Sequence, residues 1–154
     1  MPTQRPTTVT HRTSLFEDAV AIVESDFATD LSLDDIARRV ASSRRQLQRA
    51  YSEIGDTTFR DHLTGVRMDR AAELLATRAL TVREVAYRVG YRQPAQFAKA
   101  FRRHHGISPS DYRAARRRGA GPAALGVDRS DRSERIVRPV TEGAGLGRRD
   151  FAAA

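Results

Sequence analysis

Residues 81–113 read TVREVAYRVGYRQPAQFAKAFRRHHGISPSDYR, a stretch that predicts three helices separated by two sharp turns. Thr81 is placed to cap the first helix, with Glu84 three residues later to complete a capping box. Apolar residues then recur at helical spacing: Val82, Val85, Ala86 and Val89. Gly90 follows, and glycine readily takes the left-handed conformation that ends a helix. Pro94 suits the first turn of the second helix, where its missing N–H costs nothing.

The second of these helices is expected to have an apolar inner face and a polar outer one. Phe97 and Phe101 are four residues apart and therefore share the inner face. The outer positions carry hydrogen-bond donors: Gln96, Lys99, Arg102 and Arg103. Two short helices joined by a tight glycine turn, the second with these two faces, are typical of a helix-turn-helix motif.

The same pattern occurs about fifty residues earlier in the chain. Residues 31–40, LSLDDIARRV, match residues 80–89, LTVREVAYRV. After one extra residue in the second turn, three positions match Phe97, Lys99 and Phe101: Leu47, Arg49 and Tyr51. The inner positions of the two motifs carry residues of the same kind, while their outer positions carry different residues. The two motifs would therefore present different side chains to a ligand. We therefore expect an asymmetric binding site rather than a palindrome read by a symmetric dimer.

Capping and breaking residues divide the chain into segments. Ser14, Ser32 with Asp35, and Ser42 or Ser43 are expected to cap helices, while Gly55 ends one. The non-periodic ends predict a disordered arm at residues 1–12 and a disordered tail at residues 119–154. The domain between them, 13–118, contains a helix pair at about 31–55, a connecting helix at about 57–77 and a second pair at about 81–106. A helix of about 21 residues spans roughly 30 Å, close to the roughly 34 Å between successive major-groove faces.

Composition favours a polyanion-binding protein. The net charge is +8 and the pI is about 11. Lys99 is the only lysine, and the other basic residues are arginines, which favour bidentate contacts to phosphate and guanine. Residues 14–36 carry seven acidic and no basic residues, so they are expected to face away from a polyanion, as a solvated face or a partner surface. With no cysteine, no signal sequence and no apolar run of about 20 residues, we expect a cytoplasmic chain outside the membrane.

No pattern in the sequence indicates an enzyme or a cofactor site. There is no cysteine nucleophile, Ser/His/Asp set or glycine-rich phosphate loop. His104 and His105 are adjacent, and side chains of adjacent residues diverge by about 100° around a helix. We therefore expect them to cap the helix end rather than to bind a metal ion.

The spaced anchors resemble those of the DNA-binding domain of the AraC/XylS family of bacterial transcription regulators. The resemblance covers about residues 14–118. Its most specific part is Gly90-Tyr91, Phe97-Ala98-Lys99-Ala100-Phe101-Arg102 and Gly106-Ile107-Ser108-Pro109-Ser110-Asp111-Tyr112-Arg113. The resemblance implies an all-α fold of seven helices, in which two helix-turn-helix subdomains are joined by a long helix and enter adjacent major grooves of promoter DNA.

The resemblance also implies roles for individual residues. In the first recognition helix, the family's base-contacting positions fall on Arg45, Gln48 and Arg49. In the second they fall on Ala95, Gln96 and Lys99, of which Ala95 offers no donor and is suited only to a thymine methyl. Further candidates for a base or backbone contact are Arg44, Arg92, Gln93 and Ala95. Candidates for positioning phosphates are Arg102, Arg103 and the helix N-termini near Thr57 and Ser108.

The expected function is that of a sequence-specific transcription regulator that binds double-stranded DNA as a monomer, with RNA polymerase as a second candidate partner. It resembles short family members without an effector domain, or is an excised or truncated domain, and would act in the cytoplasm on nucleoid DNA. The alternative is an architectural or non-specific DNA-binding protein.

Overall fold

A computed structural model describes residues 6–77 and 79–119 of the 154-residue chain. These residues form helices and connecting turns, with no strand among them. The helices are α1 (Pro6–Asp26), α2 (Leu33–Arg39), α3 (Arg44–Glu53), α4 (Phe59–Ala76), α5 (Val82–Arg88), α6 (Pro94–His105) and α7 (Pro109–Arg117). The predicted fold class is confirmed, with the pairs α2–α3 and α5–α6 forming the two helix-turn-helix motifs. No helix in the described part is long and apolar enough to cross a membrane.

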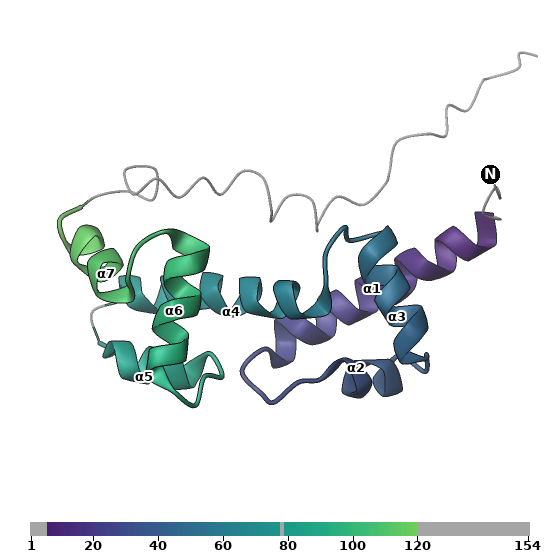
Figure 1. The fold of residues 1–154 in the computed structure, drawn as a ribbon, viewed down its shortest axis with the longest axis horizontal. Helices are drawn as coiled ribbons and strands as arrows, with labels where there is room; N and C mark the ends of the chain where they lie inside the picture. The colour runs from purple at the N-terminus through teal and green to yellow at the C-terminus, as the bar shows by residue number, and fades with distance from the viewer. Residues whose placement is uncertain (1–5, 78, 120–154) are drawn as a thin grey trace, which may run out of the picture.

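The molecule is elongated along α4. Figure 1 shows α1, α2 and α3 gathered at one end of this helix and α5, α6 and α7 at the other. The buried residues form two clusters, and α4 contributes to both: Leu63 belongs to the first, whereas Met68, Ala71, Ala72 and Leu75 belong to the second. Each end of the molecule therefore has a hydrophobic core of its own.

Tyr51 lies at the centre of the first core. Its ring meets the edges of Phe16 and Phe59, with ring centroids 5.2 and 6.1 Å away. Its hydroxyl lies 3.1 Å from Nδ1 of His62, so the two buried polar groups satisfy each other. The His62 ring is 4% exposed, and burial lowers its pKa to about 4.

Phe97 and Phe101 hold the second core together, at positions of α6 that correspond to Leu47 and Tyr51 of α3. Their ring centroids are 5.7 Å apart, and Tyr91 and Tyr112 pack on them edge to face. All four residues Leu47, Tyr51, Phe97 and Phe101 are 1% exposed or less. The internal sequence repeat therefore places corresponding residues of α3 and α6 in the two hydrophobic cores.

Local capping explains where most helices begin. Ser32, Ser43 and Thr81 each form the full capping box with the residue three positions later. The connecting helix is shorter than expected by two residues at its start and one at its end. Thr58 rather than Thr57 caps it, with its hydroxyl accepting from the Asp61 N–H, while the Thr57 N–H donates to the Tyr51 carbonyl. The resulting 18-residue helix spans about 27 Å.

The first helix begins earlier than the sequence predicts. It starts at Pro6, so the part of the expected arm that the structure describes, residues 6–12, is helical, and Ser14 lies inside the helix. Within this added stretch, Arg12 forms an ion pair with Glu53 of α3, a tertiary contact N-terminal to Ser14. The remaining arm residues and the expected tail from residue 120 onward lie outside the described residues.

Gly55 has a different role from the one expected. Residue Ile54 is the C-cap of α3, and the left-handed residue that follows is Asp56, with a φ of 47°. A Cβ on Gly55 would lie 2.6 Å from the ring of Phe16. The glycine is therefore required for the close contact between α3 and α1 rather than for the turn.

The buried His62 predicts a loss of stability in mild acid. Its pKa is about 4 when folded and 6.5 as a model value, so the unfolded chain binds more protons between these pH values. The free energy of unfolding should therefore fall as the pH drops from about 6.5 towards 4, by at most about 1.4 kcal/mol per pH unit from this group. Urea denaturation at several pH values in this window measures the slope.

The matched control for this prediction is His62→Gln, which keeps a polar side chain but does not titrate. The variant should show a shallower pH dependence between pH 6.5 and 4 than the parent. Equal slopes for the two proteins would contradict the assignment. The capping carboxylates Asp35 and Glu84, whose pKa values are lowered by hydrogen bonds, add a slope of the same sign near the acidic end of this window, but they add it equally to both proteins.

Candidate nucleic-acid interface

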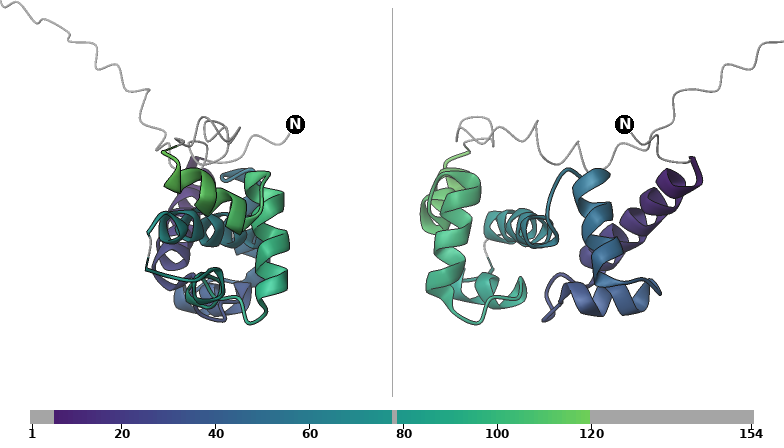
Figure 2. Two further views of the ribbon diagram at one scale, coloured as in Figure 1. Left: turned by 90° about the vertical axis from the view of Figure 1, so that its left-hand side faces the viewer. Right: turned by 45° about the vertical axis from the view of Figure 1, so that its right-hand side comes forward.

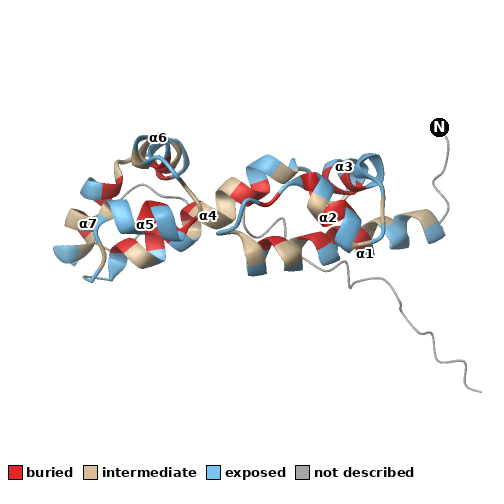
Figure 3. Cartoon of the chain, turned by 90° about the horizontal axis from the view of Figure 1, so that it is seen from below, coloured by how far each residue is buried: buried red, intermediate tan, exposed pale blue. Residues whose placement is uncertain are grey.

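The second helices of the two motifs, α3 and α6, are presented on one side of the molecule. They stand at opposite ends of α4 and run in much the same direction (Figures 1 and 2). Seen end-on in Figure 3, both lie on the same side of α4, and exposed residues form their outer surfaces. A single straight ligand along this side would meet both helices.

The outer face of α3 consists of long donor side chains. The inner face buries Leu47, Ala50 and Tyr51. Arg45, Gln48 and Arg49 are exposed and spaced so that they share one face. None of these three forms an ion pair or a side-chain hydrogen bond with another residue in the described part of the chain.

Two neighbouring side chains on α3 are engaged within the protein. Gln46 turns back to the helix start, where its Oε1 accepts hydrogen bonds from the Ser42 hydroxyl and the Ser43 N–H. Arg44 forms a 2.8 Å ion pair with Asp34 of α2, although both side chains remain more than half exposed. Arg44 is therefore less available to a ligand than Arg45 or Arg49.

The outer face of α6 is basic and has no acidic residue. Pro94 occupies the first turn, as the sequence predicts, and Gly106 ends the helix with a φ of 79°. The exposed residues along this helix include every expected contact: Ala95, Gln96, Lys99, Arg102 and Arg103. The last three form no ion pair with another described residue.

The helix N-termini differ in charge in a way that the sequence reasoning missed. Among the helices after α1, only α3 and α6 lack an acidic residue in the first turn. The partial positive charge of a helix N-terminus is left uncompensated where no carboxylate lies nearby. The two helices with donor-rich outer faces are thus also the two whose first turns favour an anion.

The helix N-termini near Thr57 and Ser108, which are expected to contact phosphates, each have a carboxylate in the first turn. The N-terminus near Thr57 is capped by Thr58, with Asp61 in the first turn. The Ser108 hydroxyl donates to the Asp111 carboxylate at 2.6 Å. A carboxylate in the first turn repels a phosphate, so these termini are weaker anion sites than those of α3 and α6.

The turn before α6 holds the remaining candidates. Gln93 is the N-cap residue but makes no side-chain capping hydrogen bond, and it is exposed. The Arg92 guanidinium lies 3.8 Å from the Asp30 carboxylate, with side chains 89% and 98% exposed. An ion pair this exposed contributes little, which leaves the Arg92 side chain available to a ligand.

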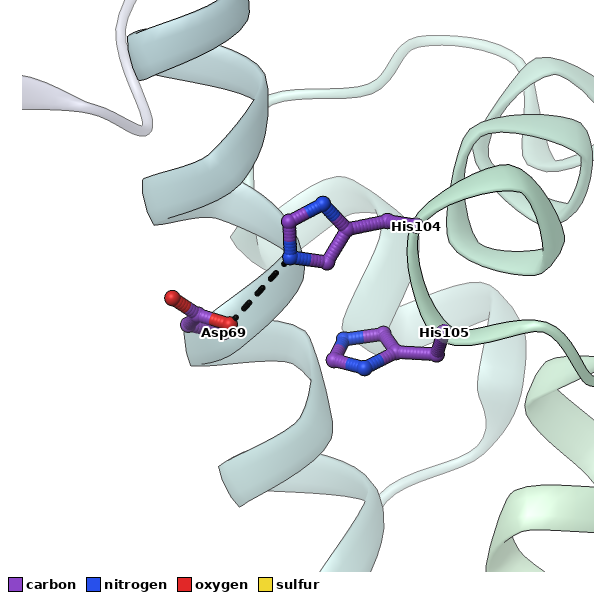
Figure 4. A group of neighbouring side chains, drawn as sticks. All are labelled: Asp69, His104 and His105. Carbon is purple, nitrogen blue, oxygen red and sulfur yellow. Dashed lines mark ion pairs between the residues drawn. The ribbon is translucent and has the colours of Figure 1, made fainter. Parts of the chain in front are cut away.

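The two histidines at the end of α6 turn towards α4 rather than capping their own helix. His104 Nε2 lies 3.4 Å from the Asp69 carboxylate, and the buried His105 lies with Nε2 3.1 Å from the Met68 carbonyl oxygen (Figure 4). The expectation that the two rings diverge is wrong, because their centroids are 4.7 Å apart and potential ligand atoms of Asp69, His104 and His105 lie within 4.8 Å of one another. With one nitrogen of each imidazole in contact with α4, the group is explained by the packing of α6 on α4.

Arg67 is a further residue whose importance the sequence reasoning missed. It lies halfway along α4, in the same row of the helix as the buried residues Leu63, Ala71 and Leu75. A charged residue in a row of buried apolar ones is a signal that the sequence does contain. The side chain is half-buried and hydrogen-bonded to the backbone of another element.

Comparison with known proteins agrees with this arrangement. Residues 36–115 match the family model described as a helix-turn-helix domain. The transcriptional activator AarP of Providencia stuartii is 31% identical over 66% of this chain and 76% of its own length. The chain spans about a third of the length of the first curated relatives that it matches.

Two solved structures are similar in fold over most of the described residues. One is a transcriptional regulator with an AraC-type DNA-binding domain from Chromobacterium violaceum, at 29% identity and a TM-score of 0.65, covering 70% of this chain and 96% of that one. The other is the DNA-binding domain of AdpA, solved in complex with a target DNA, at 31% identity and a TM-score of 0.63, covering 69% and 97%. On this evidence, the chain belongs to the AraC/XylS family and carries that family's helix-turn-helix DNA-binding domain.

Proposed function

We propose that the protein is a sequence-specific transcription regulator that reads an asymmetric promoter site with α3 and α6 in adjacent major grooves. The observation that carries this proposal is the presentation of two exposed, donor-rich helix faces on one side of α4. The two faces carry different side chains, so each half of the site would be read differently. The AdpA domain, a relative in fold and sequence, is described as bound to a target DNA.

The length of α4 supports simultaneous contact with one face of the duplex. Its 18 residues span about 27 Å, and the reading helices pack at its two ends. Successive major grooves on one face of B-DNA are about 34 Å apart. A monomer that carries both α3 and α6 on the connecting helix α4 therefore needs no partner subunit to contact two half-sites.

In α3, three side chains are suited to base edges. Arginine makes bidentate hydrogen bonds to guanine O6 and N7, which suits Arg45 and Arg49, and glutamine pairs with adenine, which suits Gln48. Each good pair contributes about 1–3 kcal/mol of discrimination. Because their donors are exposed and not engaged within the described protein, no internal contact must break first.

In α6, the base-reading set is smaller. Gln96 and Lys99 supply donors, while Ala95 supplies only a methyl group, suited to contact with a thymine methyl. We therefore assign the larger share of sequence discrimination to α3. Arg102 and Arg103, further along α6, are assigned to phosphates, with Arg92 and Gln93 in the preceding turn as further backbone contacts.

The acidic residues between positions 14 and 36 support the last part of the proposal. Glu17, Asp18 and Glu24 are exposed on α1, a helix that does not belong to either reading motif. A negative face repels DNA and is suited to a basic protein surface. We assign it to a protein partner such as RNA polymerase, with the regulator acting in the cytoplasm on nucleoid DNA.

Selection from a random duplex library at physiological salt tests the proposal. The expected result is an enriched motif of roughly 20 bp with two unlike halves centred about one helical turn apart. Binding without an enriched motif would reject the specific reading and favour an architectural DNA-binding protein. A palindromic motif would reject the monomer.

Substitutions on the two outer faces should have different consequences for specificity. Arg49→Ala removes a proposed base contact, so it should cost about 1–3 kcal/mol on the selected site and relax the preference at one position. Arg103→Ala removes a proposed phosphate contact, so it should weaken binding to all sequences alike and reduce the salt slope by about one. Titrations on the selected site and on a scrambled duplex at several salt concentrations distinguish the two.

The matched control is Arg83→Ala, an exposed arginine of α5 outside both proposed reading faces. Its effect on the preference for the selected over the scrambled duplex should be negligible. If Arg49→Ala and Arg103→Ala lower affinity for both duplexes equally, the proposed base-reading role of Arg49 is wrong.

A further inference from the structure

We propose that Arg67 fixes the two halves of the protein relative to each other, and thereby sets the spacing between half-sites that the protein accepts. Its role would be that of a positioning residue, acting on specificity without touching a base. The proposal deepens the proposed function, because a defined spacing matters only if both reading helices engage DNA together.

The position of Arg67 is the first argument. Along α4, the last residue of the first core is Leu63 and the first residue of the second core is Met68. Arg67 thus lies at the junction of the two cores, between Val66, which packs against the first, and Met68, which belongs to the second. Gly65, two residues earlier, lowers the helix propensity at the same place. A side chain at this position is placed to contact both halves.

The contacts of Arg67 join the two halves. Its Nε donates to the Phe27 carbonyl oxygen at 2.7 Å, and its Nη2 donates to the Thr29 carbonyl oxygen at 2.8 Å. Both acceptors lie in the segment between α1 and α2, which belongs to the first half. The guanidinium also lies over the ring of Tyr91, 5.7 Å from its centroid. Tyr91 precedes α6 in the turn of the second motif, so one side chain connects three elements.

The same junction brings two backbone segments into direct contact. Gly90 has a φ of 91°, and a Cβ there would lie 3.0 Å from both the Ala28 carbonyl oxygen and Arg67 Nη2. Phe27, in the facing segment, packs against both hydrophobic clusters. The segment Phe27–Asp30 is therefore seated against the turn before α6, with Arg67 holding the two together.

The geometry of this junction is transmitted to the reading helices. The turn that contains Gly90 and Tyr91 leads directly into α6 at Pro94. The facing segment leads into α2, which packs on α3 through the first core. A shift at the junction therefore changes the angle and distance between α3 and α6. Arg67→Met keeps an unbranched side chain but removes the two donors, and so should allow this shift.

The test on DNA compares duplexes in which the two selected half-sites are separated by the selected spacing or by one or two additional base pairs. One added base pair turns a half-site by about 35° around the duplex axis. The unaltered protein should lose affinity about tenfold or more when the second half-site is misplaced, because simultaneous engagement is lost. Arg67→Met should lose less than about threefold, with unchanged affinity for a single half-site.

Arg70→Met is the matched control, on the same helix and three residues away. Arg70 is exposed; among the described residues its guanidinium pairs with Glu73 at 3.2 Å and lies over the Phe27 ring, 6.0 Å from the centroid, but donates to no carbonyl oxygen of the facing segment. Its spacing profile should equal that of the unaltered protein. If Arg67→Met also shows the unaltered profile, the proposal is overturned.

A second measurement does not depend on DNA. The chain has no cysteine, so Ser52→Cys on α3 and Ser110→Cys on α7, both at exposed positions, allow specific spin labelling. The distance distribution between the labels should be narrow in the parent and broader with Arg67→Met. An unchanged width overturns the proposal, whereas broadening supports it even if library selection finds no motif and the proposed function fails.

If Arg67→Met does not fold, Arg67→Lys replaces it in both measurements. Lysine keeps the charge but lacks the planar fork that reaches two carbonyl oxygens together. It should give an intermediate broadening and an intermediate tolerance of added base pairs. A lysine variant with the width and spacing profile of the unaltered protein would count against the proposal.

Discussion

One helix has to supply two separate hydrophobic cores, and this constraint determines the rest of the structure. The residues that α4 buries change from the first core to the second between Leu63 and Met68. Each core is small, so each depends on large aromatic residues from its own motif, Tyr51 in α3 and Phe97 with Phe101 in α6. Because those residues sit on the inner faces of the two helices, the outer faces are left for a ligand on one side of the rod.

The two cores also contain buried polar groups, and these are paired. Tyr51 is buried with its hydroxyl next to His62, and His105 is buried with a ring nitrogen next to the Met68 carbonyl. A buried polar group without a partner is costly, so these contacts fix which way the helices face each other. The orientation of α6 on α4 is specified by such pairs in addition to apolar packing.

The sequence predicted those features that depend on a few neighbouring residues. The capping boxes at Ser32 and Thr81, the left-handed Gly90 and the two aromatic anchors of α6 follow from local rules. The errors concern contacts between distant segments. Arg12 of α1 pairs with Glu53, Gly55 makes room for Phe16, and His104 faces Asp69. No pattern within one segment reveals these partners. The sequence predicted which residues of α3 and α6 are candidate DNA contacts. The ion pair of Arg44 with Asp34 became apparent only from the structure.

The separation of the two cores along α4 has a consequence for how such a domain changes in evolution. A substitution under α3 or α6 alters mainly the core of its own half, since the two clusters of described residues share only Phe27. One helix-turn-helix can therefore accumulate substitutions while the core of the other is retained. The two halves of the domain can diverge separately, which a single shared core would not allow.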